Sequence, residues 1–130
     1  MQISVIIIFV LATAIMTYGY NVDILKKFYD NFAMCNKKLC TSPTEFSVEA
    51  VHCALLNDGE MINVNGEFTT NIVLRRLGDY ISEASRLERA RAIHITCRKR
   101  VIKTGATGYE QTQKTIACSM PIKDLIDKMN

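Results

Sequence analysis

The sequence predicts an all-α fold, a compact bundle of five or six short amphipathic helices held together by disulfide bonds. After position 20 the apolar residues recur mostly three or four positions apart, and no segment alternates as a half-buried strand does. Helix start and stop signals divide the chain into short segments. Five cysteines, all beyond the N-terminal apolar segment, provide the disulfides.

Residues 1–19 are predicted to be a secretory signal peptide. Residues 1–20 carry no charged side chain, and the apolar run from Val5 to Leu11 is followed by the small residues Thr17 and Gly19 before the expected cleavage point. This run is too short to cross a bilayer, and an uncleaved anchor would also need a basic flank. We therefore expect a secreted, extracellular protein. Residues 20–130 should form a single helical domain, because no repeat or linker divides them.

The first two helices are expected over residues 23–34 and from Pro43 onward. The first has apolar residues at helical spacing: Ile24, Leu25, Phe28, Tyr29 and Phe32. For the second, Ser42 can cap, Pro43 suits the first helical position and Glu45 can complete a capping box. Gly59 should end this helix because glycine readily adopts the left-handed conformation.

Two further helices are expected between residues 69 and 103, after a loop that contains Asn65-Gly66. Thr69 or Thr70 can cap the first of them, and Gly78 should stop it. Ser85 and Glu88 form a capping-box pattern at the start of the next. Its apolar residues continue to Val101, which makes it the longest helix expected.

The C-terminal part should contain two more amphipathic segments. A glycine-containing turn over residues 104–108 precedes a helix over residues 109–120, which Pro121 ends. Because proline is favoured at a helix start, Pro121 also opens a last segment. The residues expected to face inward from it are Ile122, Leu125, Ile126 and Met129.

The histidines give little support for catalysis, so we expect no enzyme activity, no cofactor and no metal. His52 and His94 are the two histidines of the chain. His52 precedes Cys53 as in secreted phospholipases, but Ala54 follows where those enzymes have aspartate, and no glycine-rich calcium loop is present. His94 and Cys97 share a helix face as a zinc pair would, yet structural zinc needs four ligands. A core or groove-lining histidine is the interpretation favoured for His94.

The segment from Arg75 to Lys103 is distinctly basic, with nine Lys and Arg residues against Asp79, Glu83 and Glu88. Such a face can attract phosphate or an anionic membrane. No aromatic residues interleave with the basic ones for base stacking, and nucleic acid is an unsuitable partner for a secreted chain. We expect no nucleic-acid partner. A solvated helix face is the favoured interpretation, and membrane contact is the less favoured one.

The cysteine number is odd. Two intrachain bridges would leave one thiol, which in a secreted protein indicates pairing with a second chain or a free reactive sulfur. The spacing alone leaves the connectivity open.

The chain resembles the fire-ant venom allergens of the type 2 and type 4 family, relatives of insect odorant-binding proteins. The resemblance rests on Ile24-Leu25-Lys26-Lys27, on Cys35 and Cys40, and on the segment Val48-Glu49-Ala50-Val51-His52-Cys53-Ala54, and it is collinear over nearly the whole mature chain. Two allergen cysteines, near Leu77 and around Leu87 to Ala92, have no counterpart here. The cysteine spacings of the odorant-binding pattern also differ.

The resemblance implies an odorant-binding-like domain with bridges Cys35–Cys53 and Cys97–Cys118. The first would tie the first helix to the second, and the other would tie the long helix to the next. In this family an extra cysteine in the turn after the first helix makes the interchain bridge of a homodimer, which points to Cys40. The resemblance also implies a venom-gland product.

The function expected from these observations is a secreted, allergen-like venom protein that carries a small hydrophobic ligand, such as a pheromone or odorant. Each residue expected to line its ligand site has plain core packing as its alternative role. The alternative function is a ligandless, toxin-like interaction protein that acts through its basic surface. Ligand identity and the role in venom or chemosensation are not readable from the residues. The expected ligand-binding residues are Phe28, Phe32, Val51, Leu55, Ile72, Val73, Ile93 and Ile116.

Overall fold

The structure, a computed structural model, describes residues 21–42 and 45–129. Across these residues it contains five α-helices, one 3₁₀-helix and no strand, so the all-α bundle predicted from the sequence is confirmed. The predicted signal peptide at residues 1–19 lies outside the described residues. The elements are α2 (Val22–Lys38), α3 (Val48–Asp58), α4 (Thr70–Tyr80), α5 (Ala84–Lys103), α6 (Gly108–Cys118) and η1 (Met120–Asp124).

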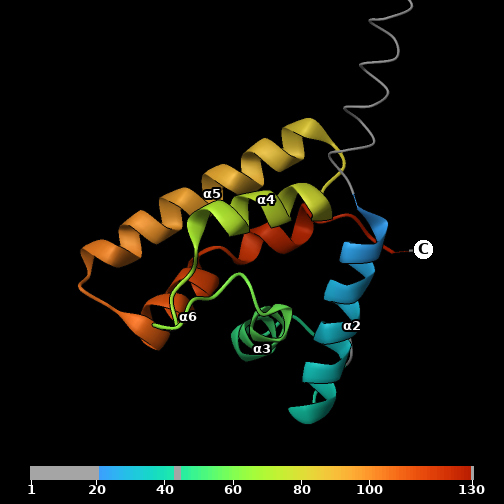
Figure 1. Ribbon diagram of the computed structural model, residues 1–130, viewed down its shortest axis with the longest axis horizontal. Coiled ribbons are helices and arrows are strands. Elements are labelled where there is room, and N and C mark those ends of the chain that lie inside the picture. Colours follow the sequence, from blue (N-terminus) through green and yellow to red (C-terminus); the bar gives the residue numbers. More distant parts are fainter. Residues whose placement is uncertain (1–20, 43–44, 130) are drawn as a thin grey trace, which may run out of the picture.

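The five α-helices form a closed ring of contacts. α2 packs on α3, α3 on α6, α6 on α5, α5 on α4, and α4 returns to α2. Figure 1 shows α5 as the long helix across one side of the molecule, with α4 alongside it and α2 at the far end. η1 packs on α5 and α6. Each helix can therefore turn its apolar face toward one shared interior.

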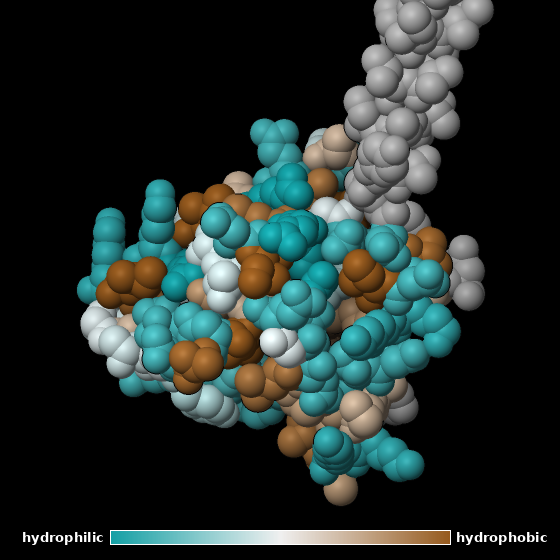
Figure 2. Space-filling model, viewed as in Figure 1, coloured by the Kyte–Doolittle hydropathy of each residue, from teal (hydrophilic) through white to brown (hydrophobic). Residues whose placement is uncertain are grey.

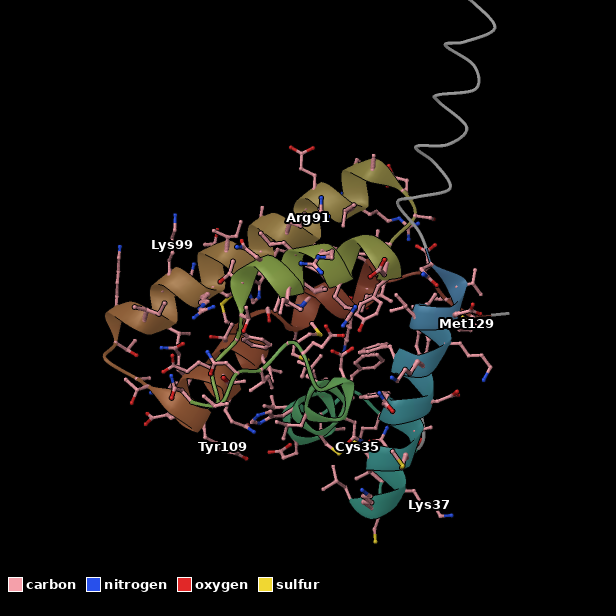
Figure 3. The ribbon with its side chains drawn as sticks, in the orientation of Figure 1. Cys35, Lys37, Arg91, Lys99, Tyr109 and Met129 are labelled. Atoms are coloured by element: carbon pink, nitrogen blue, oxygen red, sulfur yellow. A yellow bond between two sulfur atoms is a disulfide. The ribbon has the colours of Figure 1, made fainter. Side chains whose placement is uncertain are left out.

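Two disulfides hold two of these contacts. Cys35 of α2 is bonded to Cys53 of α3, with their Cα atoms 5.9 Å apart. Cys97 of α5 is bonded to Cys118 of α6, with a Cα separation of 5.7 Å. These are the two pairs that the resemblance implies. Figure 3 shows Cys35 on the side of α2 that faces α3.

The first helix is longer than predicted, and the second begins later. α2 begins after Asn21, whose side chain accepts a hydrogen bond from the backbone N–H of Ile24, and it continues past the predicted end to Lys38. The predicted cap at Ser42 is wrong, because α3 begins only at Val48. Its cap is Ser47, whose hydroxyl accepts from the N–H of Ala50 at 3.0 Å.

A buried asparagine explains the late start of α3. Asn36 is fully buried on α2, and its amide donates to the carbonyl of Glu45 at 3.0 Å. Its side-chain oxygen accepts from the hydroxyl of Thr41 at 2.8 Å. These bonds hold the backbone at Glu45 against α2, outside any helix. Gly59 ends α3 in the left-handed conformation at φ 84°, as predicted.

The predicted boundaries of α4 and α5 need two corrections. Gly78 does not stop α4, which runs on to Tyr80. A Cβ atom at Gly78 would lie 3.0 Å from the guanidinium of Arg91, so the glycine permits the close approach of α5. The cap of α5 is Glu83, whose carboxylate accepts from the N–H groups of Ser85 and Arg86; Ser85 is therefore not the cap. α5 is the longest helix, as predicted.

The last segment differs most from its prediction. Pro121 opens only the short 3₁₀-helix η1, after which Leu125 and Ile126 turn into the core. Met129 was predicted to face inward, but it is exposed. Asp127 anchors this segment. Its N–H donates to the backbone carbonyl of Tyr80, and its own carbonyl accepts from the hydroxyl of Tyr29 at 2.9 Å.

The loop between α3 and α4 contributes to the core and to the start of α6. Ile62 and Phe68 form an isolated antiparallel bridge, which brings the ends of the loop together. The carboxylate of Glu67 accepts from the N–H of Gly108 at 2.8 Å, at the first residue of α6. A negative charge at a helix N-terminus is favourable, so this contact stabilises the start of α6.

The cap of α3 provides a test of the fold. Replacing Ser47 with alanine removes the hydrogen bond to Ala50, and we expect it to lower the free energy of unfolding by about 1 kcal/mol. Thr69 occupies the equivalent position before α4 but makes no side-chain capping bond. Thr69→Ala should therefore cost less than half as much. Urea denaturation of both variants measures the difference, and equal losses would contradict the assignment of Ser47 as the cap.

Candidate functional site

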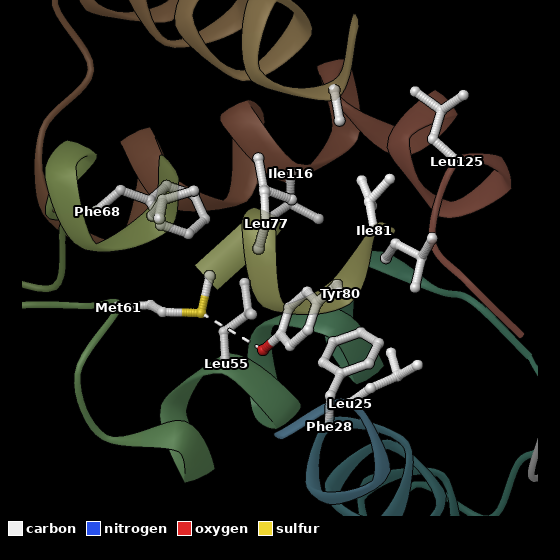
Figure 4. Close-up of a cluster of buried hydrophobic side chains, with 13 residues drawn as sticks. Leu25, Phe28, Leu55, Met61, Phe68, Leu77, Tyr80, Ile81, Ile116 and Leu125 are labelled. Carbon is white, nitrogen blue, oxygen red and sulfur yellow. Dashed lines mark hydrogen bonds between the residues drawn. The ribbon is translucent and has the colours of Figure 1, made fainter. Parts of the chain in front are cut away.

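The interior contains a cavity of about 80 Å³, partly open to solvent, which we call the central cavity. Every helix contributes side chains to it, and the lining is almost entirely apolar. Figure 4 shows part of the surrounding core, with Leu55, Leu77, Tyr80 and Ile116 grouped between the helices. The lining residues are Phe28, Phe46, Val51, Leu55, Met61, Phe68, Val73, Leu77, Tyr80, His94, Ile116, Ser119, Met120, Ile122, Lys123 and Ile126.

The predicted ligand-binding residues divide into two groups in the structure. Three of them lie off the central cavity: Phe32 belongs to a separate small cluster beside Cys35, and Ile72 and Ile93 pack against the main core from partly buried positions. The others lie together around the cavity. These are Phe28, Val51, Leu55, Val73 and Ile116.

Several lining residues did not appear in the sequence-based set. Met61 and Phe68 come from the loop between α3 and α4, which a helical pattern does not address. Leu77 and Tyr80 follow Val73 by four and seven positions, so the helical period would have found them once Val73 was chosen. His94 lines the cavity next to the predicted Ile93, in agreement with its interpretation as a groove-lining histidine.

His94 is the least satisfied polar side chain of the cavity. It is only 3% exposed, its ring lies edge-on to Phe68 with 5.2 Å between centroids, and within the described residues its Nε2 atom has no hydrogen-bond partner. Burial, together with the smaller effect of the positive charge of Arg98 one turn away, lowers the pKa of His94 to about 4. The imidazole is therefore neutral at neutral pH.

Tyr80 is a second polar group on the wall. Its hydroxyl donates to the sulfur of Met61 at 4.0 Å, drawn as the dashed line in Figure 4. A thioether sulfur is a weak acceptor. Burial raises the pKa of Tyr80, so the hydroxyl keeps its proton. The ring of Tyr80 packs on Phe28 with centroids 4.7 Å apart.

The outer end of the cavity is formed by side chains that remain partly exposed. They include Phe46 and the η1 residues Met120 and Ile122. Lys123 is exposed, and its ammonium group lies 6.0 Å from the centre of the Phe46 ring. We call the fully buried part of the lining at His94 the buried end, and the partly exposed part formed by Phe46, Met120 and Ile122 the outer end.

His52 has a structural environment and does not face the central cavity. It is 3% exposed, its Nδ1 lies 2.6 Å from the amide nitrogen of Gln113, and its ring packs 4.8 Å from that of Tyr109. Burial lowers its pKa. The amide of Gln113 contacts one of the two ring nitrogens, and together these contacts fit a histidine that joins α3 to α6.

We next consider whether the structure contains a group of metal ligands or a helix suited to a membrane. In the part of the chain that the structure describes, no three His, Cys, Asp or Glu side chains come close enough together to hold a metal ion. Cys97, which shares a face with His94, is in a disulfide. Among the helices described, none has both the length and the apolar character needed to cross a bilayer.

Several basic side chains of the segment from Arg75 to Lys103 form ion pairs or hydrogen bonds with other parts of the protein. Arg76 pairs with Asp58 at 3.0 Å and with Glu60 at 2.9 Å. Arg91 donates to the carbonyl of Leu74, and Arg98 donates to that of Phe68. The exposed basic residues are Arg75, Arg89, Lys99, Arg100 and Lys103.

Within this segment, all of which the structure describes, Ile102 is the one large apolar side chain that is exposed. Figure 3 shows Lys99 extending away from the bundle into solvent. On the face shown in Figure 2, hydrophobic side chains are intermixed with hydrophilic ones. A solvated helix face fits this arrangement better than a membrane-binding surface does.

The pKa of His94 leads to a stability test. The free histidine has a pKa of 6.5 and the folded one about 4, so the unfolded chain binds this proton first as the pH falls. Protonation of His94 in the unfolded chain should therefore lower the free energy of unfolding by about 3 kcal/mol between pH 6.5 and pH 4. Above pH 6.5 this loss is absent. His94→Leu should flatten this loss and, by removing an unpaired buried atom, raise stability at neutral pH.

Urea unfolding at several pH values measures both effects. His52→Gln is the matched control, because it removes the other buried histidine and leaves His94 in place. If wild type and His94→Leu lose the same stability between these pH values, the assignment of His94 as a buried, neutral side chain is wrong.

Comparison with known proteins gives one match. The family model of the ant venom allergen Sol i 2 family matches residues 34–123, which is more than half of the chain and spans α3, α4, α5 and α6. It includes all five cysteines. Neither the curated proteins nor the solved structures yield a match. The chain belongs to the ant venom allergen Sol i 2 family.

Proposed function

We propose that this protein is a secreted, non-enzymatic carrier in venom that holds a small hydrophobic ligand in the central cavity. The observation that carries the proposal is the cavity itself, an apolar space of about 80 Å³ to which every helix contributes. Membership of a venom allergen family and two intrachain disulfides support a secreted protein. The ligand would bind because hydrocarbon leaves water for an apolar lining.

The size of the cavity limits the ligand. An empty apolar cavity of about 150 Å³ can bind benzene, so about 80 Å³ accommodates roughly half that bulk without rearrangement. Larger ligands, including those of five carbons, require the outer end to open. The side chains there, Met120 and Ile122, lie on a 3₁₀-helix of only five residues. Such a short helix has few internal hydrogen bonds to break.

The expected affinity follows from the area buried. Each buried methylene group contributes about 0.8 kcal/mol, so a chain of about five carbons gains roughly 4 kcal/mol. This free energy corresponds to dissociation constants in the millimolar range. Longer chains should bind more tightly if they extend past η1.

Methyl NMR of the purified, disulfide-bonded protein tests the cavity. Titration with n-pentane should shift the methyl signals of Leu55, Val73 and Ile116 in a saturable way, because these side chains line the cavity. Val73→Met adds bulk to the lining and should weaken binding severalfold. Val22→Met makes the same change at an exposed position and should leave binding unaltered. Absence of any saturable shift in these methyl groups would rule out the carrier.

We also propose that Cys40 joins two copies of the chain. Cys35, Cys53, Cys97 and Cys118 are already paired, while the thiol of Cys40 is exposed in the turn after α2. The neighbouring Leu39 is 42% exposed, and it provides apolar surface for a contact around the bridge. A secreted thiol in this setting is suited to an interchain disulfide.

The bridge is tested on a non-reducing gel and by intact mass. Wild type should give a dimer that reduction converts to monomer, and Cys40→Ser should give monomer under both conditions. Lys37→Ala, a change at another exposed residue near the same turn, should remain dimeric. A wild-type monomer, or a dimer that persists in Cys40→Ser, would contradict the proposed linkage.

A further inference from the structure

The polar atoms of the central cavity define what its ligand should carry. Nε2 of His94 is buried, lines the cavity and lacks a hydrogen-bond partner among the described residues. Most buried polar atoms in proteins are paired, and an unpaired one calls for an explanation. The lining around His94 is apolar, so the protein itself offers no partner there.

Water is a poor substitute for a partner at this position. A buried water molecule generally needs two to four polar contacts to be held. The hydroxyl of Ser119, which also lines the cavity, donates to the carbonyl of Thr115, and the hydroxyl of Tyr80 donates to Met61. Because a thioether is a weak acceptor, this hydroxyl can also turn to a better one at little cost. A ligand oxygen at the buried end would supply the partner that Nε2 of His94 lacks.

The charges around the cavity favour an uncharged oxygen. Arg98, whose charge acts on His94, donates to the carbonyl of Phe68 and to the hydroxyl of Thr70, and it is not among the residues that line the cavity. Lys123 is exposed, and its ammonium group lies over the ring of Phe46 at the outer end. A carboxylate at the buried end would therefore lose its hydration without gaining a cation.

We propose that the central cavity takes a small uncharged molecule with one oxygen, an alcohol or a ketone, whose oxygen hydrogen-bonds to Nε2 of His94. The hydrocarbon part extends toward Met120 and Ile122 at the outer end. A neutral imidazole nitrogen can accept from a hydroxyl in one tautomer and donate to a carbonyl in the other, so both classes share the contact. This inference rests on the carrier function and adds the chemical class of its ligand.

The test compares three ligands of the same carbon number, n-pentanol, diethyl ketone and n-pentane, on three forms of the disulfide-bonded protein. These are wild type, His94→Leu, which keeps an apolar wall, and His94→Gln, which restores a hydrogen-bonding group. Affinities come from methyl NMR. The nitrogen-15 shift of His94 Nε2 in wild type reports directly on the hydrogen bond.

We expect His94→Leu to weaken n-pentanol and diethyl ketone by roughly tenfold relative to its effect on n-pentane. His94→Gln should recover part of that loss for the oxygen-bearing ligands. The Nε2 signal of His94 should shift with n-pentanol and diethyl ketone and stay in place with n-pentane. Comparing ligands within each variant removes the effect of the substitution on the cavity shape.

The outcomes separate the two proposals. If all three ligands bind and His94→Leu changes them equally, with no Nε2 shift, the cavity binds hydrocarbon and the role of His94 is overturned. Pentanoate is added as a fourth ligand. If it binds more tightly than n-pentanol and shifts Nε2, the ligand is an acid and the inference of an uncharged oxygen is overturned. If none of the ligands binds, the carrier function itself falls.

Discussion

The closed ring of helix contacts is the constraint on which the interior depends. Five short helices can enclose a common space only if each holds its place against two neighbours. The ring does so through α2, α3, α6, α5 and α4, in that spatial order. Two of its five contacts are covalent, at Cys35–Cys53 and Cys97–Cys118.

The disulfides offset the loss of stability caused by an incompletely filled core. A cavity of about 80 Å³ costs about 2 kcal/mol at the rate measured for cavities created in protein cores. A disulfide that closes a loop of about twenty residues stabilises by about 3 kcal/mol. Cys97 is also one turn from His94 on α5, so the same bond that offsets the empty space fixes the position of the buried histidine.

The sequence predicted the helices well and their ends less well. Amphipathic periodicity depends on burial of one face, and that burial is what the ring provides. The ends depend on single contacts between distant segments. Asn36 holds the backbone before α3, and Arg91 fills the space beside Gly78, so neither Ser42 nor Gly78 has the role its local sequence indicates.

The candidate site was predictable to the extent that it follows helix periodicity. Val73 and Ile116 were found on that basis, and Ile93 was chosen where its neighbour His94 faces the cavity. A hydrophobic pattern ranks isoleucine above histidine, whereas the rotation of α5 against its neighbours decides which of the two points inward. Met61 and Phe68 reach the cavity from a loop, and their position depends on the bridge between Ile62 and Phe68.

The anchoring of Asp127 has a consequence for the order of folding. Its carbonyl is joined to the hydroxyl of Tyr29 across 98 positions of the chain, and it holds the segment that brings Ile122 and Ile126 to the cavity. Closing so long a loop in an unfolded chain costs more conformational entropy than closing the short connections between α2 and α3 and between α5 and α6. The helix pairs should therefore assemble first, and the outer wall of the cavity should close as a late step in the folding of this protein.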